Sequence, residues 1–345
     1  MPTPTEFHLF TSLRYDPILL TSSENSQSWL NYVSPSPFYM LIYHRDRMLE
    51  AAQHFDFHAV AAKLQDGEAL HKSLLQEVSK YVEKGGKDEP LKLRILFDKS
   101  ASMTVELSPL PPVPLITLYP PSFSPPNASP TPPHPANADF TPSPLTGGAL
   151  TLGATESLPG QSTASNPTSP PEWVFRLDTA PTPTTPFTIL KTTCRDFYDE
   201  SRARALPTNP LGNSYTEVLL YNEVSELTEG TMTTIYVFRG GRWVTPPVGV
   251  PAGEFTSSTL KSTESGNGNK DADEGELRIP FAGRWGHSLR SSKVGAGGQR
   301  GTSRRWALKM GFCMEEPTGI DTVKVGEGVW VSNGVRGFGF GRVVE

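Results

Sequence analysis

A proline-rich segment divides this chain and limits what can fold on either side of it. Residues 108–171 hold more than half of the chain's 34 prolines, contain no Lys or Arg, and carry only Asp139 and Glu156 as charged side chains. Proline removes a backbone donor, and a segment with so few apolar residues cannot offset the entropy of being ordered. We predict a flexible linker or insert over most of this stretch, with one short strand at Pro114–Tyr119 where apolar residues gather.

The two flanking regions have the mixed patterns of an α+β fold. We predict a small N-terminal domain over 1–107 and a larger β-rich domain over 172–345, which contains a second insert, rich in Gly and Ser, at 252–296. In the first region, alternation and helical spacing predict a strand within 7–20, an apolar run at Phe38–Tyr43 leading into a helix, a helix at Ala69–Val82, and a hairpin of Leu91–Phe97 with Met103–Leu107. In the second region they predict strands at Trp173–Leu177, Thr216–Tyr221, Thr233–Phe238, Arg242–Val244 and Val329–Ser332, and helices after Arg195 and from Gly301 to about Met310.

Charge and cysteine content argue against several classes of function. The formal net charge is −5, so there is no overall basic field for nucleic acid. No apolar run approaches the roughly 20 residues that span a bilayer. Two cysteines, Cys194 and Cys313, cannot form a disulfide framework or a cysteine-rich zinc site, which fits a reducing compartment. With no signal-peptide pattern in Met1–Glu6, we expect a cytoplasmic protein that binds no membrane, nucleic acid or metal.

Lys191 is the first candidate for chemistry. It lies in the stretch Phe187–Arg195, which begins after a β-like run and leads into a helical segment. Desolvation and nearby cations lower the pKa of a lysine, and the neutral amine can then form a Schiff base. A lysine in such a setting is by itself more often an exposed surface residue, so the assignment depends on other motifs.

Four further motifs accompany Lys191 in a defined order, namely His44–Arg47, Glu226–Thr231, Val244–Pro246 and Gly301–Arg304. In this order and context they resemble the class IV aminotransferase family of pyridoxal-phosphate (PLP) enzymes. The resemblance implies PLP fold type IV, like that of D-amino acid aminotransferase, with the cofactor in a cleft between two domains. It covers about residues 7–107, 172–250 and 297–343. In three segments the amino-acid sequence is most similar to that of fungal 4-amino-4-deoxychorismate lyases. These segments are Leu13–Pro17, Leu190–Tyr198 and Ser332–Val335.

The resemblance implies a role for each matching residue. Lys191 is similar to the lysine that bonds to the cofactor aldehyde and later moves the substrate proton. Glu229 resembles the glutamate that faces the pyridine nitrogen, where a carboxylate favours the protonated, electron-accepting ring. The implied phosphate ligands are Arg47, Thr302, Ser303, Asn333 and Gly334, since guanidinium groups and the N–H groups of a helix N-terminus suit an anion. Arg14 aligns with a first-strand arginine that could bind a substrate carboxylate; a structural ion pair is equally open.

The chain departs from the family pattern in two places. Thr234 stands where an asparagine usually closes the glutamate segment, and the 252–296 insert separates Thr245 and Pro246 from the predicted phosphate-binding segment.

The implied function is cleavage of 4-amino-4-deoxychorismate to 4-aminobenzoate and pyruvate in folate synthesis. A class IV aminotransferase acting on a branched-chain amino acid, a D-amino acid or a chiral amine stays open, because Lys191 and Glu229 serve both reactions. A third possibility is a non-catalytic protein that docks through its Pro-x-x-Pro repeats. Relatives are commonly dimers, so a homodimer is also expected.

Overall fold

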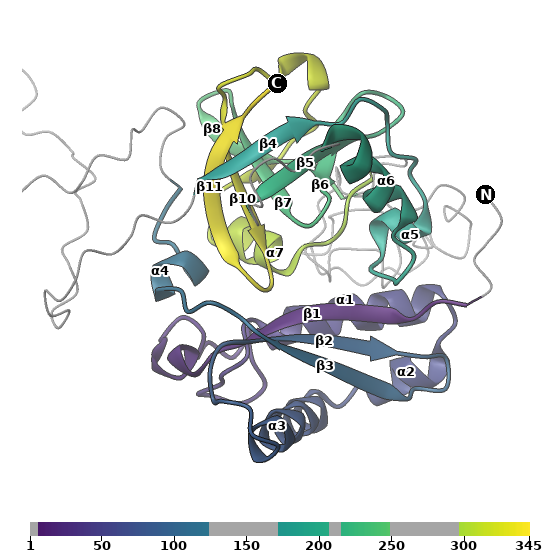
Figure 1. The fold of residues 1–345 in the computed structure, drawn as a ribbon, viewed down its shortest axis with the longest axis vertical. Coiled ribbons are helices and arrows are strands. Elements are labelled where there is room, and N and C mark those ends of the chain that lie inside the picture. Colours follow the sequence, from purple (N-terminus) through teal and green to yellow (C-terminus); the bar gives the residue numbers. More distant parts are fainter. Residues whose placement is uncertain (1–5, 124–171, 207–214, 249–296) are drawn as a thin grey trace, which may run out of the picture. The chain divides into compact units, whose positions relative to one another are not determined.

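The computed structural model describes residues 6–123, 172–206, 215–248 and 297–345. The helices and strands of these residues mix in an α+β arrangement, as predicted, around two sheets (Figure 1). Most of the segment predicted to be flexible from Pro120 to about residue 170, and the insert at 252–296, lie outside the described residues. At the start of that segment the prediction is wrong, because Phe123 is buried in the core against Tyr236 and Trp330.

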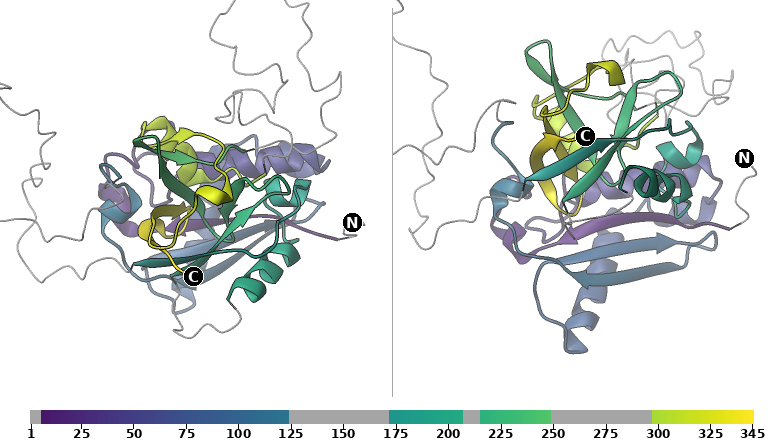
Figure 2. Two further views of the ribbon diagram at one scale, coloured as in Figure 1. Left: turned by 90° about the horizontal axis from the view of Figure 1, so that it is seen from above. Right: turned by 45° about the horizontal axis from the view of Figure 1, so that its top comes forward.

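The first sheet is antiparallel, with three strands in the order β1-β2-β3. It contains β1 (Leu9–Tyr15), β2 (Leu91–Phe97) and β3 (Met103–Pro109), and the helices packed with it are α1 (Leu41–His54), α2 (His58–Lys63) and α3 (Gly67–Glu83). Figure 2 shows these strands and helices from two further directions. The predicted hairpin and the long helix that ends before Gly85 are confirmed, whereas α2 was not predicted.

Strand alternation gives this sheet two different faces. Every second residue of β2, from Leu91 to Phe97, is fully buried in the core that the helices share. The residues between them, including Lys92 and Arg94, point to the opposite face. Register places Ser12 of β1 beside Arg94, and Arg94 beside Glu106 of β3. One face therefore forms a hydrophobic core and the other carries charge.

The second sheet has eight strands in the order β6-β5-β4-β11-β10-β7-β8-β9. Its strands are β4 (Trp173–Leu177), β5 (Thr216–Tyr221), β6 (Leu227–Gly230), β7 (Thr234–Arg239), β8 (Arg242–Thr245), β9 (Met314–Glu315), β10 (Gly328–Asn333) and β11 (Gly337–Val343). Helices α5 (Pro186–Ile189), α6 (Asp196–Ala205) and α7 (Thr302–Lys309) connect them, and η1 (Pro17–Thr21) and η4 (Ile320–Thr322) are short 3-10 turns. The five strands predicted in this region are confirmed to within a residue or two at their ends.

Two predictions about local structure are wrong. Residues 114–119 form not a strand but a helical turn, α4 (Leu115–Leu118). Pro114 precedes the turn with a φ of −66°, which suits the start of a helix, and the carbonyl of Leu118 accepts a hydrogen bond from Tyr39 at 2.5 Å. Lys191 follows the short helix α5 rather than a β-like run.

The glycine-rich end of the chain was not predicted to be a strand, yet it forms β11. Its glycines make room for Trp173 of the neighbouring strand, since a Cβ at Gly341 would lie 1.8 Å from the Trp173 carbonyl oxygen. Glycine is tolerated in strands where another backbone comes this close.

Strand β1 of the small sheet forms backbone hydrogen bonds with two connecting segments of the second region, one between α5 and α6 and one between β10 and β11. The N–H of Phe10 donates to the carbonyl of Lys191 at 3.3 Å, and the N–H of Arg14 donates to the carbonyl of Gly334 at 3.1 Å.

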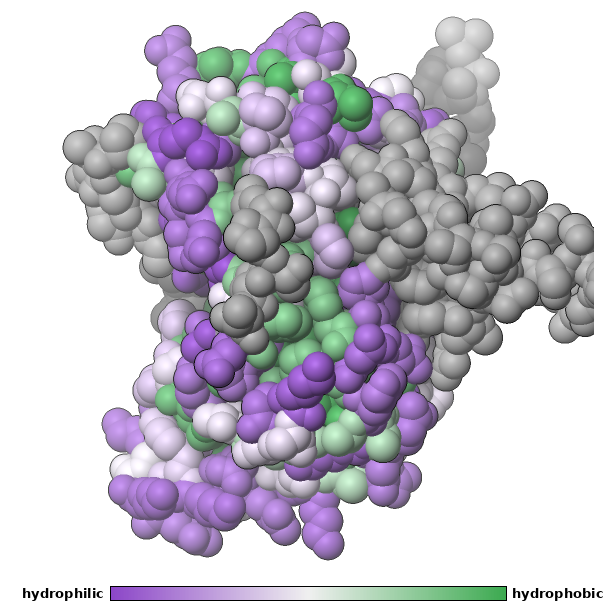
Figure 3. Space-filling view, turned by 90° about the vertical axis from the view of Figure 1, so that its right-hand side faces the viewer, coloured by the Kyte–Doolittle hydropathy of each residue, from purple (hydrophilic) through white to green (hydrophobic). Residues whose placement is uncertain are grey.

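On the face of the molecule drawn in Figure 3, apolar residues gather between hydrophilic ones. The division into domains at residue 107 stays a prediction. No helix among the described residues is long and apolar enough to cross a membrane.

Candidate active site

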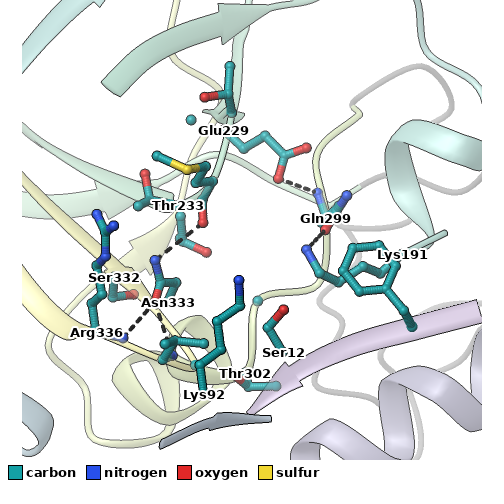
Figure 4. A pocket seen from close by; sticks show the side chains of 18 of the residues that line it. Ser12, Lys92, Lys191, Glu229, Thr233, Gln299, Thr302, Ser332, Asn333 and Arg336 are labelled. Carbon is teal, nitrogen blue, oxygen red and sulfur yellow. Dashed lines mark hydrogen bonds between the residues drawn. The ribbon is translucent and has the colours of Figure 1, made fainter. Parts of the chain in front are cut away.

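A cavity of about 520 Å³ lies where the charged face of the small sheet meets loops of the large one. Most of its lining is polar or charged (Figure 4). The lining residues are Phe10, Ser12, Arg47, Lys92, Arg94, Glu106, Leu110, Lys191, Arg195, Glu229–Thr234, Gln299, Gly301, Thr302 and Ser332–Arg336. Segments far apart in the sequence thus contribute to one site.

Lys191 extends into this cavity from the segment between α5 and α6. Its Nζ atom lies 3.4 Å from Gln299 Oε1 and 4.9 Å from the centre of the Phe10 ring. Burial holds the pKa of the Lys191 amine well below its usual value, and the positive charges of Arg47 and Arg195 lower it further. A neutral amine is a nucleophile and a base, so this environment favours both roles.

Glu229 lies at the far end of a short chain of hydrogen bonds that begins at Lys191 and passes through Gln299. It is on β6 and is only 8% exposed. One carboxylate oxygen accepts from the Tyr198 hydroxyl at 2.5 Å and the other accepts from the Gln299 N–H at 3.1 Å. Burial raises the pKa of Glu229 to about 7, although these hydrogen bonds and the nearby Lys191 act in the other direction. A buried acid of this kind can face a protonated ring nitrogen.

A pocket for an anion lies beside Arg47 of α1. The Arg47 Nη2 atom donates to Thr11 Oγ1 at 2.5 Å, and Thr11 in turn contacts His44 Nδ1 at 2.7 Å. Among the described residues, Arg47 Nε, His44 Nε2 and Thr302 Oγ1 are buried without a hydrogen-bond partner. A Cβ at Gly334 would lie 2.5 Å from the His44 ring and 2.7 Å from Thr302 Oγ1. Unpaired buried donors around a space this tight are expected where a ligand completes them.

The N-terminus of α7 lies at this pocket, because Gly301 and Thr302 both line the cavity. Free N–H groups at a helix N-terminus favour a phosphate, and an arginine and a hydroxyl complete a typical donor set. These donors, together with Lys191 and Glu229 in the same cavity, fit PLP, which carries a phosphate, an aldehyde and a ring nitrogen.

The cavity contains most of the residues predicted from the sequence, but not all of them. Lys191, Glu229, Arg47, Thr302, Asn333 and Gly334 all line it. Ser303 does not: its hydroxyl donates to Ser332 Oγ at 2.8 Å in the buried interior. Asn333 lines the cavity, and its Oδ1 atom accepts from the N–H groups of Val335 and Arg336 at 3.0 and 2.8 Å, which fixes the turn.

Arg14 is buried outside the lining of the cavity. Its guanidinium pairs with Asp16 at 2.6 Å and donates to the carbonyls of Val335 and Pro111 at 3.2 and 3.1 Å. Of the two roles that the sequence left open, these contacts favour the structural ion pair.

The 252–296 insert does not keep Pro246 from the phosphate-binding segment. Arg304 of α7 donates to the Pro246 carbonyl at 3.0 Å and also pairs with Glu315 of β9. Thr234, the residue that departs from the family pattern, lines the cavity and lies against Gly301, where a Cβ would be 2.3 Å from Thr234 Oγ1.

Sequence reasoning missed several lining residues. The period-2 alternation of β2 could have found Lys92 and Arg94, since both lie opposite the core-facing leucines. Gln299, which touches both Lys191 and Tyr198, gave no signal beyond its nearness to the predicted phosphate-binding segment. Among the described residues, no group of His, Cys, Asp and Glu could hold a metal ion.

Comparison with known families finds a similarity over part of the chain. Residues 134–263 match the family model described as Amino-transferase class IV. This part of the chain is therefore similar to the class IV aminotransferases, and the match covers 130 of the 345 residues. No curated protein sequence matches this chain.

Several solved structures are similar to the chain at low sequence identity. A putative amino-acid aminotransferase from Mesorhizobium loti is 16% identical with a TM-score of 0.49, over 98% of this chain and 100% of that one. A putative 4-amino-4-deoxychorismate lyase from Legionella pneumophila is 9% identical with a TM-score of 0.49, over 100% of this chain and 88% of that one. The branched-chain amino acid aminotransferase from Escherichia coli is 10% identical with a TM-score of 0.47, over 99% and 77%.

Proposed function

We propose that this protein is a PLP-dependent lyase that converts 4-amino-4-deoxychorismate to 4-aminobenzoate and pyruvate. The observation that carries the proposal is one cavity that holds an amine of lowered pKa, a buried carboxylate, an anion pocket and additional cations. A cofactor with a phosphate accounts for only part of this positive charge. The remaining cations suit a substrate with two carboxylates.

Each end of the cofactor has a candidate partner. Arg47, Thr302 and the backbone at Asn333 and Gly334 would hold the phosphate, and Glu229 would face the ring nitrogen. When bound, PLP supplies an aldehyde that bonds covalently to amines and a ring that accepts electrons. Tyr198 and Gln299 hold the Glu229 carboxylate in one orientation, and a fixed acid keeps the ring nitrogen protonated.

Lys92, Arg94, Arg195 and Arg336 are the cations we assign to the substrate carboxylates. Lys92 has no ion-pair partner among the described residues and extends into the open cavity in Figure 4. Arg94 pairs with Glu106 at 3.0 Å, and Arg195 donates to the Thr231 carbonyl at 2.9 Å. Side chains that are already anchored in this way lose less freedom when a carboxylate binds.

Lys191 carries the proton transfer in this proposal. Its neutral Nζ takes the proton from the amine-bearing carbon of the substrate, as its lowered pKa favours. Loss of the enolpyruvyl group then makes the product ring aromatic. The substrate contains all the atoms of 4-aminobenzoate and pyruvate, so the reaction needs no second substrate.

An acceptor-dependence assay tests the proposal. Purified protein given PLP should be yellow, and borohydride should fix the cofactor to Lys191. With 4-amino-4-deoxychorismate it should release pyruvate in the absence of any keto acid. Turnover that requires a keto-acid acceptor would instead identify an aminotransferase, because the early proton transfer is common to both reactions.

Three further expectations accompany this function. Removal of residues 124–170, which keeps the buried Phe123, should leave activity intact, whereas an interaction protein that uses the Pro-x-x-Pro repeats would lose its function. Sedimentation should give a homodimer, and cell fractionation should place the protein in the cytoplasm.

A further inference from the structure

Gln299 has side-chain contacts that the proposed function does not use. It lies in the segment just before α7, and Figure 4 shows it between Glu229 and Lys191. Its side-chain oxygen is 3.4 Å from Lys191 Nζ, and its side-chain nitrogen donates to the Tyr198 hydroxyl at 2.9 Å. Its backbone N–H donates to Glu229. Gln299 therefore contacts Lys191, Tyr198 and Glu229.

The direction of each hydrogen bond follows from the one at Glu229. Tyr198 has a single hydroxyl proton, and the 2.5 Å contact assigns it to the Glu229 carboxylate. The Tyr198 oxygen can then accept, so the NH₂ group of Gln299 faces Tyr198 and its carbonyl oxygen faces Lys191. The donors run in one direction, from Lys191 through Gln299 and Tyr198 to Glu229.

The backbone that leads to Gln299 is shaped for this position. Gly297 and Gly298 have φ values of +78° and +83°, which glycine adopts readily and other residues rarely do. A Cβ at Gly298 would be 3.0 Å from the carbonyl oxygen of Thr228, next to Glu229. The two glycines thus let the chain approach β6 closely enough for the Gln299 N–H to reach the carboxylate.

We propose that Gln299 is a positioning residue that bridges the Lys191 amine to the Tyr198–Glu229 pair and thereby controls the protonation of the amine. The inference deepens the proposed function, on which it rests for the role of Lys191. A carboxamide suits this task because its oxygen accepts a hydrogen bond from a charged amine without adding a net charge. An apolar side chain would remove that acceptor, and a carboxylate would add a charge.

The groups that face Lys191 set the background for this effect. Arg47 from α1, Arg195 before α6 and Lys92 from β2 oppose the charged amine, while Glu229 from β6 favours it. The Phe10 ring of β1 covers the amine without a titratable group. None of these groups is itself replaced in the Gln299 variants, so a shift in the titration of the Lys191 amine can be attributed to the loss or change of the Gln299 side chain.

Trace acetylation of full-length, cofactor-free protein with acetic anhydride over a pH series measures the Lys191 amine directly. Acetylation blocks trypsin at Lys191, so mass spectrometry follows the intact peptide 177–195, which has no other lysine or internal arginine. Gln299→Leu should move the titration midpoint down and label several-fold faster at a given pH below the midpoint. Gln299→Glu should move it up and label about tenfold slower, since one pKa unit is a tenfold change.

Matched replacements at Gln76, an exposed residue of α3, provide the control: Gln76→Leu and Gln76→Glu should leave the profile of Lys191 unchanged. Gln299→Met repeats the apolar test if the leucine variant does not fold by thermal unfolding. The proposed role of Gln299 would be wrong if the titration midpoint of Lys191 stayed fixed in these variants. It would also be wrong if the midpoint moved in the same direction in the apolar and acidic variants. This outcome is separate from failure of the proposed function, which borohydride trapping and pyruvate release decide.

Discussion

The small sheet and the large sheet contribute to one cavity in different ways. The small sheet presents Ser12, Lys92 and Arg94 through strand alternation alone, from the face opposite its hydrophobic core. The large sheet contributes mainly through strand ends and the segments between elements, including Lys191, Glu229 and Gln299. Side chains on a regular strand are aimed by its pleat, whereas those on connecting segments need specific partners to hold them.

Glu217 illustrates what the large sheet needs for this purpose. It is fully buried, and its carboxylate accepts from Thr231 at 2.5 Å, from Thr233 at 2.9 Å and from the Met232 N–H at 3.0 Å. Arg202 lies 3.4 Å away as its ion-pair partner. These bonds fix the turn between β6 and β7, all of which lines the cavity. A buried carboxylate therefore holds this turn, while the strands on either side of it also pack in an apolar core.

The largest difference between the two regions should appear when one lysine from each is removed. Lys191→Ala should lose covalent cofactor attachment, and its activity should fall on the order of 10³-fold or more, because the base itself is lost. Lys92→Ala should keep the yellow colour and raise KM by about tenfold through the loss of one carboxylate contact. Absorbance and steady-state kinetics measure both effects. Similar losses of kcat in the two variants would contradict the division of roles.

Removal of buried and exposed carboxylates should separate the regions by stability. Glu217→Ala should destabilise the fold by about 3–5 kcal/mol, because Arg202 and three donors lose their partner. Glu106→Ala in the small sheet breaks an exposed pair with Arg94 and should cost less than about 1 kcal/mol. Urea unfolding of the two variants makes the comparison, and equal costs would remove the distinction.

Glu229 should make the stability of the cofactor-free protein depend on pH. Its pKa rises from 4.5 to about 7 on folding, so the fold favours the protonated acid. The resulting stabilisation is fully present below pH 4.5 and is lost as pH rises through 7, by about 3 kcal/mol in total. Urea unfolding from about pH 5 to about pH 8 should show a decline in wild type that Glu229→Gln lacks. Parallel curves for the two proteins would argue against a raised pKa.

A further difference should come from α1, the helix that carries Arg47 into the lining of the cavity. Arg47→Ala should weaken cofactor binding by about 10- to 100-fold, the usual value of a charge-assisted hydrogen bond. Arg45→Ala, two residues earlier on α1 and outside the cavity lining, is the matched control and should bind normally. Fluorescence titration gives both dissociation constants. Weakened binding in the Arg45 variant would show that the helix, rather than the Arg47 contact, was disturbed.

Local patterns predicted most of the elements, because alternation and helical spacing report burial directly. The strand prediction at 114–119 failed because prolines close to apolar residues favour a helical turn, which packs against Tyr39. Strand β11 was not predicted because it is rich in glycine, and these glycines leave space for the neighbouring Trp173. A short sequence segment cannot predict either outcome, since each depends on contact with an aromatic residue far away in the sequence, Tyr39 or Trp173.

The sequence by itself determined the α+β class, the order of the motifs and the residue types suited to a PLP-like ligand. Only the tertiary structure decided which of those residues share a cavity: it brought Arg47 to Thr302, turned Ser303 inward and paired Arg14 with Asp16. It also brought Gln299 between Lys191 and Glu229. The physical reason is that motifs encode local conformation and chemistry, whereas burial, hydrogen-bond partners and pKa depend on segments more than a hundred residues apart.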